Sequence, residues 1–276
     1  MFFVFDVGGT HTRIGFSRDD MSLEGSPVIT QTPLRYEDGI ALLADTAKKY
    51  AASGQFKIAA GGLPGVIDQV QGALVRAPHL EGWVDKPFVA DLSAALGVRV
   101  LVENDAALAG LGEAVRGAGK GNGIVAYLTV STGVGGVRIV NGKIDAHRIG
   151  FEPGHQIIAH HDQSYITLES LVSGSGIERR LGKKPEMISD KAVWQEVSEK
   201  FAIGVANTIL FWAPDIVVVG GALKDRLSLT VLAERLGQII LVLPTLPKIT
   251  LASLESTSGL YGAIEIARTE ASKEIN

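Results

Sequence analysis

The chain has 276 residues, a length that suits one large domain or two of ordinary size. Hydrophobic residues make up 46% and charged residues 20%, which is typical of a globular protein and argues against long disorder. The 26 Lys and Arg residues against 30 Asp and Glu residues give a formal net charge of −4. Nucleic acid is therefore not expected as a main partner, because its backbone demands an excess of positive charge.

Cysteine is absent from the sequence. This excludes disulfides, iron–sulfur clusters and cysteine-ligated zinc, and it fits a cytoplasmic protein. The five apolar residues before Asp6 are too few for a signal peptide or a membrane span, and no other stretch reaches span length without charge. We therefore expect no membrane partner.

Apolar runs typical of strands alternate with helical apolar spacing, which indicates an α/β fold. In chain order, the expected strands are Phe2–Val7, Arg13–Phe16, Phe56–Ala60, Val98–Val102, Gly123–Val130, Gly136–Val140 and Ile216–Val219. The expected helices are Ile40–Ala52, Phe88–Leu96, Asp105–Val115, Leu168–Leu181, Lys191–Phe211 and Leu260–Glu270.

A strand, a glycine-rich turn and a second strand occur twice, first at residues 2–16 and again at residues 124–140. Each unit predicts an antiparallel hairpin that begins a lobe of its own. The glycine-rich linker at 116–123 is the natural boundary, although an ordinary surface loop has the same composition. We expect a small N-terminal lobe over 1–116 and a large C-terminal lobe over 117–276, and we allow for the last helix, about 260–270, packing back on the small lobe.

The two turns share a chemistry that suits phosphate. In the first, Gly8 and Gly9 let backbone N–H groups approach an anion, and the hydroxyls of Thr10 and Thr12 add donors. Asp6 ends the strand beside them and could hold a hydrated Mg²⁺, which prefers few protein ligands and several waters. A plain hairpin explains either turn alone; a second one, at residues 131–136, makes a pair that would suit a polyphosphate.

Glu103-Asn104-Asp105 follows an apolar strand and precedes a helix, where α/β enzymes place reacting groups. Helix capping by Asn104 is the alternative interpretation, and it is compatible with a catalytic Asp105. Further along, Glu152, His155 and Glu169 could bind several hydroxyl groups, although a solvated Pro-Gly turn explains the first two equally well. A metal site of His155, His160 and His161 is disfavoured.

A buried strand ends at Gly220-Gly221, where a base or ribose could lie against backbone, although an ordinary strand-to-helix turn looks the same. The phosphate-loop pattern G-x-x-x-x-G-K-[ST] is absent, and so is G-x-G-x-x-G after the first strand. A P-loop enzyme and a dinucleotide-dependent dehydrogenase are therefore disfavoured.

Taken together, the motifs resemble the ROK family of sugar kinases. The resemblance spans nearly the whole chain and is carried, in order, by DVGGT (6–10), GLPGVID (62–68), APHLEGW (77–83), ENDA (103–106), STGVGG (131–136), EPGH (152–155), Glu169 with LVSG (171–174), and VVVGG (217–221). It implies a two-lobed, actin-like (ribonuclease-H-like) α/β fold with hexose and ATP in the cleft between lobes.

The resemblance also implies roles for single residues. Asp105 matches the catalytic base that faces the sugar hydroxyl. The sugar contacts are Gly65, Asn104, Glu152, His155 and Glu169. The nucleotide contacts are Gly8, Gly9, Thr10, Thr12, Thr132 and Gly133 for the phosphates, with Gly220 and Gly221 for the nucleoside.

The sequence departs from the family in three places. Many members have a zinc-binding cysteine cluster after the histidine, whereas residues 156–168 contain no cysteine, so no zinc is expected. His11 stands where a lysine is common, and His79 replaces the usual asparagine of the loop before Trp83.

The expected function is ATP- and Mg²⁺-dependent phosphorylation of a hexose, at the 6-hydroxyl of glucose or of a related or N-acetylated sugar. The expected partners are the hexose, ATP and, by resemblance only, a second copy in a homodimer. The alternative is a non-catalytic sugar sensor acting through a protein partner.

Overall fold

We describe the protein from a computed structural model, which covers residues 1–276 except 19–20, 52–54, 163 and 274–276. The chain forms two compact units. Unit 1 consists of Met1–Arg116, His147–Gly150 and Ser256–Asn276, and unit 2 of Gly117–Ala146 and Phe151–Glu255. The last segment of the chain therefore belongs to the unit that contains the first.

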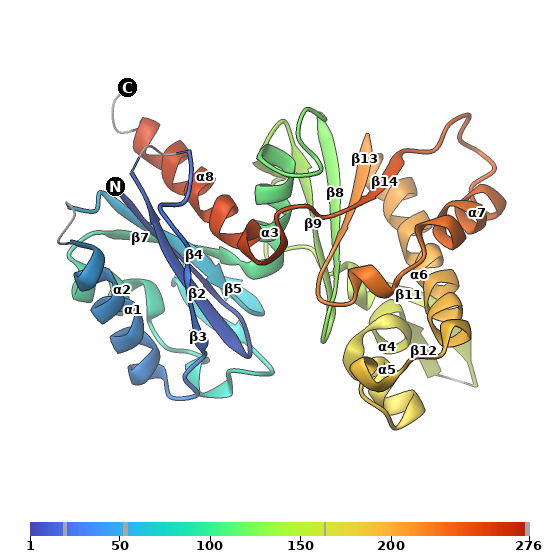
Figure 1. The fold of residues 1–276 in the computed structure, drawn as a ribbon, viewed down its shortest axis with the longest axis horizontal. Helices are drawn as coiled ribbons and strands as arrows, with labels where there is room; N and C mark the ends of the chain where they lie inside the picture. Colours follow the sequence, from blue (N-terminus) through green and yellow to red (C-terminus); the bar gives the residue numbers. More distant parts are fainter. Residues whose placement is uncertain (19–20, 52–54, 163, 274–276) are drawn as a thin grey trace. The chain divides into compact units, whose positions relative to one another are not determined.

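Unit 1 is built on a five-stranded sheet of order β3-β2-β1-β4-β7 (Figure 1). The hairpin of β1 and β2 is antiparallel and β3 extends it, whereas β4 and β7 run parallel to β1. The strands are β1 (Phe2–Val7), β2 (His11–Ser17), β3 (Val28–Gln31), β4 (Ile58–Leu63) and β7 (Arg99–Asn104), with a separate hairpin of β5 (Val66–Asp68) and β6 (Ala73–Arg76).

The apolar run at the start of the chain is explained by burial of β1 on both faces. Phe3 and Phe5 pack in the core under α1 (Tyr36–Ala51), η1 (Glu81–Trp83) and α2 (Phe88–Leu96). Phe2 and Val4 point to the other face, where they meet α3 (Asp105–Val115) and α8 (Ser258–Lys273).

Helices α3 and α8 cross closely because glycine stands at both contact points. A Cβ atom added at Gly112 would overlap the carbonyl oxygen of Ser258, and one added at Gly262 would overlap that of Leu108. The Ser258 hydroxyl donates a 3.0 Å hydrogen bond to the fully buried carboxylate of Glu113.

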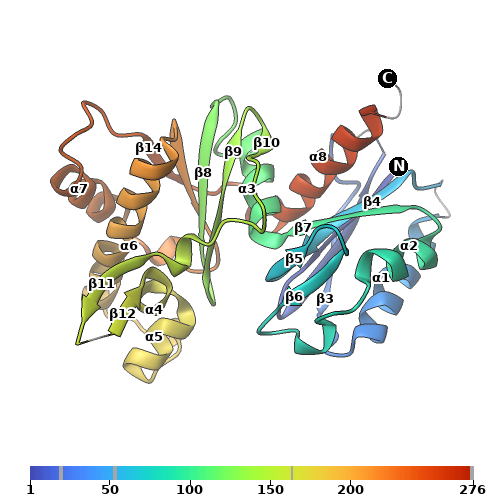
Figure 2. The same ribbon diagram turned by 180° about the vertical axis from the view of Figure 1, so that it is seen from behind.

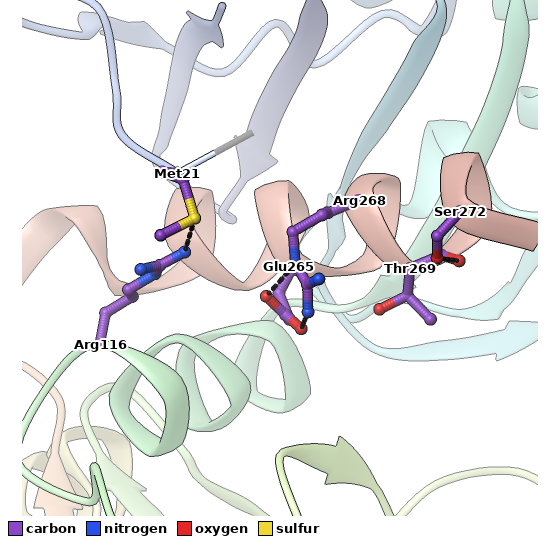
Figure 3. A network of polar contacts seen from close by, with 6 residues as sticks. All are labelled: Met21, Arg116, Glu265, Arg268, Thr269 and Ser272. Atoms are coloured by element: carbon purple, nitrogen blue, oxygen red, sulfur yellow. Dashed lines mark hydrogen bonds and ion pairs between the residues drawn. The ribbon is translucent and has the colours of Figure 1, made fainter. Parts of the chain in front are cut away.

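Figure 3 shows polar contacts within α8 and one contact beside it. Arg268 pairs with Glu265 within the helix, and the Ser272 hydroxyl donates to the carbonyl oxygen of Thr269. Arg116, just after α3, donates to the sulfur atom of Met21.

Unit 2 repeats the sheet topology of unit 1. Its order is β10-β9-β8-β13-β14, again with an antiparallel hairpin extended by a third strand and two strands parallel to the first. These strands are β8 (Ile124–Val130), β9 (Val134–Val140), β10 (Lys143–Ile144), β13 (Ile216–Gly220) and β14 (Lys248–Leu251).

The core of unit 2 lies between this sheet and the helices that pack on its β8–β13 face. The helical segments are η2 (Pro153–His155), α4 (Leu168–Val172), α5 (Gly174–Leu181), η3 (Pro185–Met187), α6 (Lys191–Trp212), η4 (Lys224–Arg226) and α7 (Leu229–Ile239). The short η5 (Glu255–Thr257) spans the point where the chain returns to unit 1. A small hairpin of β11 (Ile157–His161) and β12 (Ser164–Thr167) links η2 to α4.

Two expectations for helices need correction. The single helix expected over 168–181 is two helices, because Ser173 adopts extended backbone (φ −73°, ψ 160°) and its hydroxyl accepts the N–H of Gly176. The helix expected over 40–52 begins at Tyr36, and its expected last residue, Ala52, lies outside the described residues. Within the described part of the chain, no helix is both long and apolar enough to cross a membrane.

Candidate active site

The first glycine turn joins β1 to β2 and is stabilised by hydrogen bonds of threonine hydroxyls. Thr32 donates a 2.7 Å hydrogen bond to the carbonyl oxygen of Gly8. Its hydroxyl also lies 3.0 Å from that of Thr12, so Thr12 is the donor between them. Thr12 is 1% exposed, whereas Thr10 is exposed. The Thr12 hydroxyl thus stabilises the turn from inside, and no sequence motif indicated its partner Thr32.

Asp6 lies beside this turn, opposite Arg13 in the hairpin register, with 3.9 Å between the Oδ2 and Nη1 atoms. Burial raises the pKa of Asp6 to about 6, while Arg13 acts in the opposite direction. Glycine at position 62 lies between the Asp6 carboxylate and the backbone of Asp105. A Cβ atom there would lie 3.1 Å from both Asp6 Oδ1 and Asp105 Cα.

A single carboxylate beside a glycine turn suits Mg²⁺, which keeps most of its water shell. Among the described residues, no group of three or more His, Cys, Asp or Glu side chains could hold a metal ion directly. The donor set therefore fits a hydrated Mg²⁺ held through Asp6 and water.

Asn104 and Asp105 lie where β7 ends and α3 begins. Asn104 is the N-cap: its Oδ1 accepts the N–H of Ala107 at 3.1 Å, and its Nδ2 donates to the carbonyl oxygen of Gly65 at 2.9 Å. Gly65 has a φ of +101°, which favours glycine. The half-buried Asp105 accepts the N–H of Ala106 at 2.8 Å. Asn104 therefore supplies the N-cap hydrogen bond of α3, and Asp105 is the first residue of that helix.

Glu103 is a further residue of this corner for which sequence reasoning gave no role. It accepts the N–H of Asn104 at 2.7 Å and the side-chain amide of Gln69 at 3.3 Å. Burial raises the pKa of Glu103, while the hydrogen bond from Asn104 and the nearby His147 act in the opposite direction.

In unit 2 the second glycine turn is bound by a carboxylate. Glu169, in the first turn of α4, accepts the N–H of Val134 at 2.8 Å. A Cβ atom at Gly133 would lie 2.7 Å from the same oxygen, Glu169 Oε2. Ser175, at the start of α5, donates to the carbonyl oxygen of Thr132 at 2.8 Å, and the Thr132 side chain is exposed. Glu169, which we expect to contact the sugar, thus lies directly against the turn that we expect to contact the phosphates.

The side chains of Glu152 and His155 are exposed at the two ends of η2. Between them, Gly154 packs against the carbonyl oxygen of Val134, the residue whose N–H group Glu169 accepts. In unit 2, the three polar residues expected on the sugar, Glu152, His155 and Glu169, thus lie on segments that contact the start of β9.

The Gly220-Gly221 turn follows β13. Gly221 has a φ of +90°, and a Cβ atom there would overlap the carbonyl oxygen of Val130, which also accepts the N–H of Leu223 at 3.0 Å. This turn is thereby fixed against the end of β8, next to the second glycine turn.

Each unit therefore gathers its candidate residues at the carboxyl ends of its parallel strands, where open α/β sheets bind ligands. Unit 1 carries Asp6, Gly8, Gly9, Thr10, Gly65, Asn104 and Asp105, and unit 2 carries Thr132, Gly133, Glu152, His155, Glu169, Gly220 and Gly221.

The model of the ROK family matches residues 3–270 of the chain. The chain belongs to the ROK family. The resemblance seen in the ordered motifs and the expected ROK kinase fold are both confirmed. The crystal structure of the ROK hexokinase from Thermus thermophilus superposes with a TM-score of 0.84 at 27% identity, covering 98% of each chain.

Two curated ROK relatives have similar identity over nearly their full length. The glucokinase of Thermotoga maritima is 25% identical over 95% of this chain and 96% of its own, and the N-acetyl-D-glucosamine kinase of Escherichia fergusonii is 28% identical over 95% and 98%. The chain spans about half the length of the bifunctional NanE/NanK enzymes of Brucella that it also matches.

Proposed function

We propose that this ROK protein is an ATP-dependent hexose kinase that transfers the γ-phosphoryl group to a sugar hydroxyl. The acceptor is the 6-hydroxyl of glucose or of a related or N-acetylated hexose. The observation that carries the proposal is the junction of β7 and α3, where Asn104 caps the helix and holds the Gly65 loop while Asp105 stands beside it. The glucokinase and N-acetylglucosamine kinase relatives support this sugar class.

In phosphoryl transfer, the protein aligns donor and acceptor and stabilises charge. Asp105 accepts the proton of the attacking hydroxyl as the sugar oxygen bonds to the γ-phosphorus atom. The bond from that phosphorus to the bridging oxygen breaks, and ADP leaves with its electron pair. A general base of this kind contributes about 10²–10⁴-fold to the rate.

The sugar is held by hydroxyl contacts to Asn104, Glu152, His155 and Glu169 and by close approach to Gly65. Glu169 already uses Oε2 to accept the N–H of Val134, so Oε1 is the atom for a sugar hydroxyl. This arrangement fixes the sugar relative to the second glycine turn.

The phosphates are bound by backbone N–H groups of Gly8, Gly9 and Gly133 and by the hydroxyls of Thr10 and Thr132, and the nucleoside lies on Gly220 and Gly221. Thr12 supports its turn from inside. Asp6 would hold a hydrated Mg²⁺, which would offset the charge of the phosphates.

A coupled assay of ADP release over a panel of hexoses and N-acetylhexosamines tests the proposal. We expect Mg²⁺-dependent ADP release with at least one of these sugars. A parallel preparation of Asp105→Asn reports any contaminating kinase. Absence of sugar-dependent ADP release from the wild-type protein across the panel would overturn the proposal.

A further inference from the structure

Gln156, the residue directly after η2, connects three segments of unit 2 through its side chain and backbone. Its Nε2 donates a 2.7 Å hydrogen bond to the carbonyl oxygen of Pro153, inside η2. Its Oε1 accepts a 2.8 Å hydrogen bond from Nδ2 of Asn207 on α6. Its backbone carbonyl oxygen accepts the N–H of Leu168, the first residue of α4, at 3.0 Å.

The same face of α6 also seats α4. Gly204 lies three residues before Asn207, on the same side of the helix. A Cβ atom at Gly204 would overlap the Leu168 side chain, so glycine allows Leu168 to pack directly on the α6 backbone. The Gly204 carbonyl oxygen also lies 3.4 Å from Gln156 Nε2. Figure 2 shows α4 beside α6.

The two amides define each other's orientation. The Pro153 carbonyl oxygen can only accept a hydrogen bond, so the Gln156 side chain must present its NH₂ group to it. The Gln156 Oε1 atom then faces Asn207. Asn207 must then present its own NH₂ group. A carboxylate at position 156 has no hydrogen to donate to the Pro153 carbonyl, so two acceptor oxygens would face each other. A carboxylate at position 207 would likewise have no hydrogen to donate to Oε1 of Gln156.

We propose that Gln156 and Asn207 form a positioning pair that holds the sugar-binding residues of unit 2, on η2 and α4, in fixed positions relative to one another. Glu152 and His155 flank the Pro153 carbonyl on η2, and Glu169 follows Leu168 on α4. The pair fixes η2 to the turn of α6 from Gly204 to Asn207, on which Leu168 of α4 also packs. This inference rests on the proposed kinase function for its effect on sugar binding, but not for its effect on η2.

The isosteric variants Gln156→Glu and Asn207→Asp each remove one of these donors. We expect either change to raise the sugar KM about three- to tenfold, as the loss of a part-buried hydrogen bond implies. The KM for ATP and kcat stay within about twofold, because contacts formed equally in ground and transition states alter KM alone. Amide hydrogen exchange should increase in a peptide covering 152–158.

Ser198→Ala is the matched control. Ser198 is buried on the same helix, where its hydroxyl donates to the carbonyl oxygen of Trp194 at 2.7 Å and accepts the N–H of Ser228 at 2.9 Å. Neither partner belongs to η2 or α4. We expect its sugar KM and the exchange of residues 152–158 to equal those of the wild type.

Hydrogen exchange separates the two proposals. Unchanged exchange at 152–158 in both carboxylate variants would overturn the positioning pair, whatever the activity. Increased exchange with an unchanged sugar KM in an active enzyme would also overturn it. A wild-type protein inactive on every sugar, with increased exchange in the variants, would overturn the kinase proposal and leave the pair as a support of η2.

Discussion

The carboxylate of Asp6 lies against the first turn of α8, because a Cβ atom at Gly259 would be 2.9 Å from both its Cγ and its Oδ2. The first strand of the chain and its last helix thus build one corner of the candidate site. The same closeness buries the carboxylate and raises its pKa to about 6, so ionisation of Asp6 is costly in the folded protein.

Asp6→Asn should stabilise the protein at neutral pH while removing phosphoryl transfer. Because the folded-state pKa of Asp6 is raised from 3.8 to about 6, protonation of Asp6 favours the folded state. This stabilising contribution is fully present below pH 3.8 and is lost as the pH rises through 6. The difference corresponds to roughly 3 kcal/mol at pH 8. Urea unfolding should show a gain for Asp6→Asn at pH 8 that shrinks toward pH 4.5. An equal gain at both pH values would contradict the role of burial.

Asp105→Asn should leave the fold and hexose binding nearly unchanged but lower turnover by about 10²–10⁴-fold, because the variant has no base for the hydroxyl proton. The N-cap hydrogen bond of α3 is made by Asn104, which the variant keeps, and asparagine at 105 has nearly the size of aspartate. Turnover and calorimetric sugar binding on the same preparation check this. Near-normal turnover would remove Asp105 from the catalytic role.

We expect Thr12→Val to affect stability and Thr10→Val to affect the KM for ATP. Loss of the buried Thr12 hydroxyl leaves Thr32 without its donor and lowers the free energy of unfolding by about 1 kcal/mol, with little change in the KM for ATP. Loss of the exposed Thr10 hydroxyl should raise the KM for ATP severalfold with no loss of stability. The reverse pattern would place Thr12 on the phosphates.

Gly112→Ala should destabilise unit 1 by about 2–3 kcal/mol, because the new Cβ atom would overlap the backbone of Ser258 and force α8 away from α3. The control is Gly237→Ala on α7, where a Cβ atom has nothing within 4 Å. The control should stabilise the protein by up to about 1 kcal/mol, since alanine favours helix more than glycine does. Thermal unfolding of the two variants gives the comparison; equal effects would contradict close packing of the helices.

The parts of the fold predicted well from the sequence are those set by local pattern. The apolar run at Phe2–Val7 and the glycines after it specify a buried strand and a turn, and the same signals recur at Ile124–Val130. Edge strands such as β3 and β14 were missed because they are short and mostly not buried, so no apolar period marks them. The break at Ser173 was missed because the apolar spacing continues through it.

The supporting partners in the site were missed for a different reason. Thr32 meets the Gly8 turn from 24 residues away, and Asn207 meets Gln156 from 51 residues away. Contacts of this span follow from how whole elements pack, and one sequence carries no local signal for them. The motif residues themselves stand at strand ends, where a pattern of glycine and polar residues is readable.

The position of α8 at the end of the chain has a consequence for synthesis on the ribosome. Phe2, Val4 and Leu108 share a core cluster with Leu260 and Ile264 of α8, which are translated after every strand of unit 2. The packing on this face of the first sheet is therefore completed only after the strands of unit 2 have been synthesised. A nascent chain that holds all of β1–β14 still lacks Gly259 beside Asp6, so this corner of the candidate site forms only after the start of α8 has been translated.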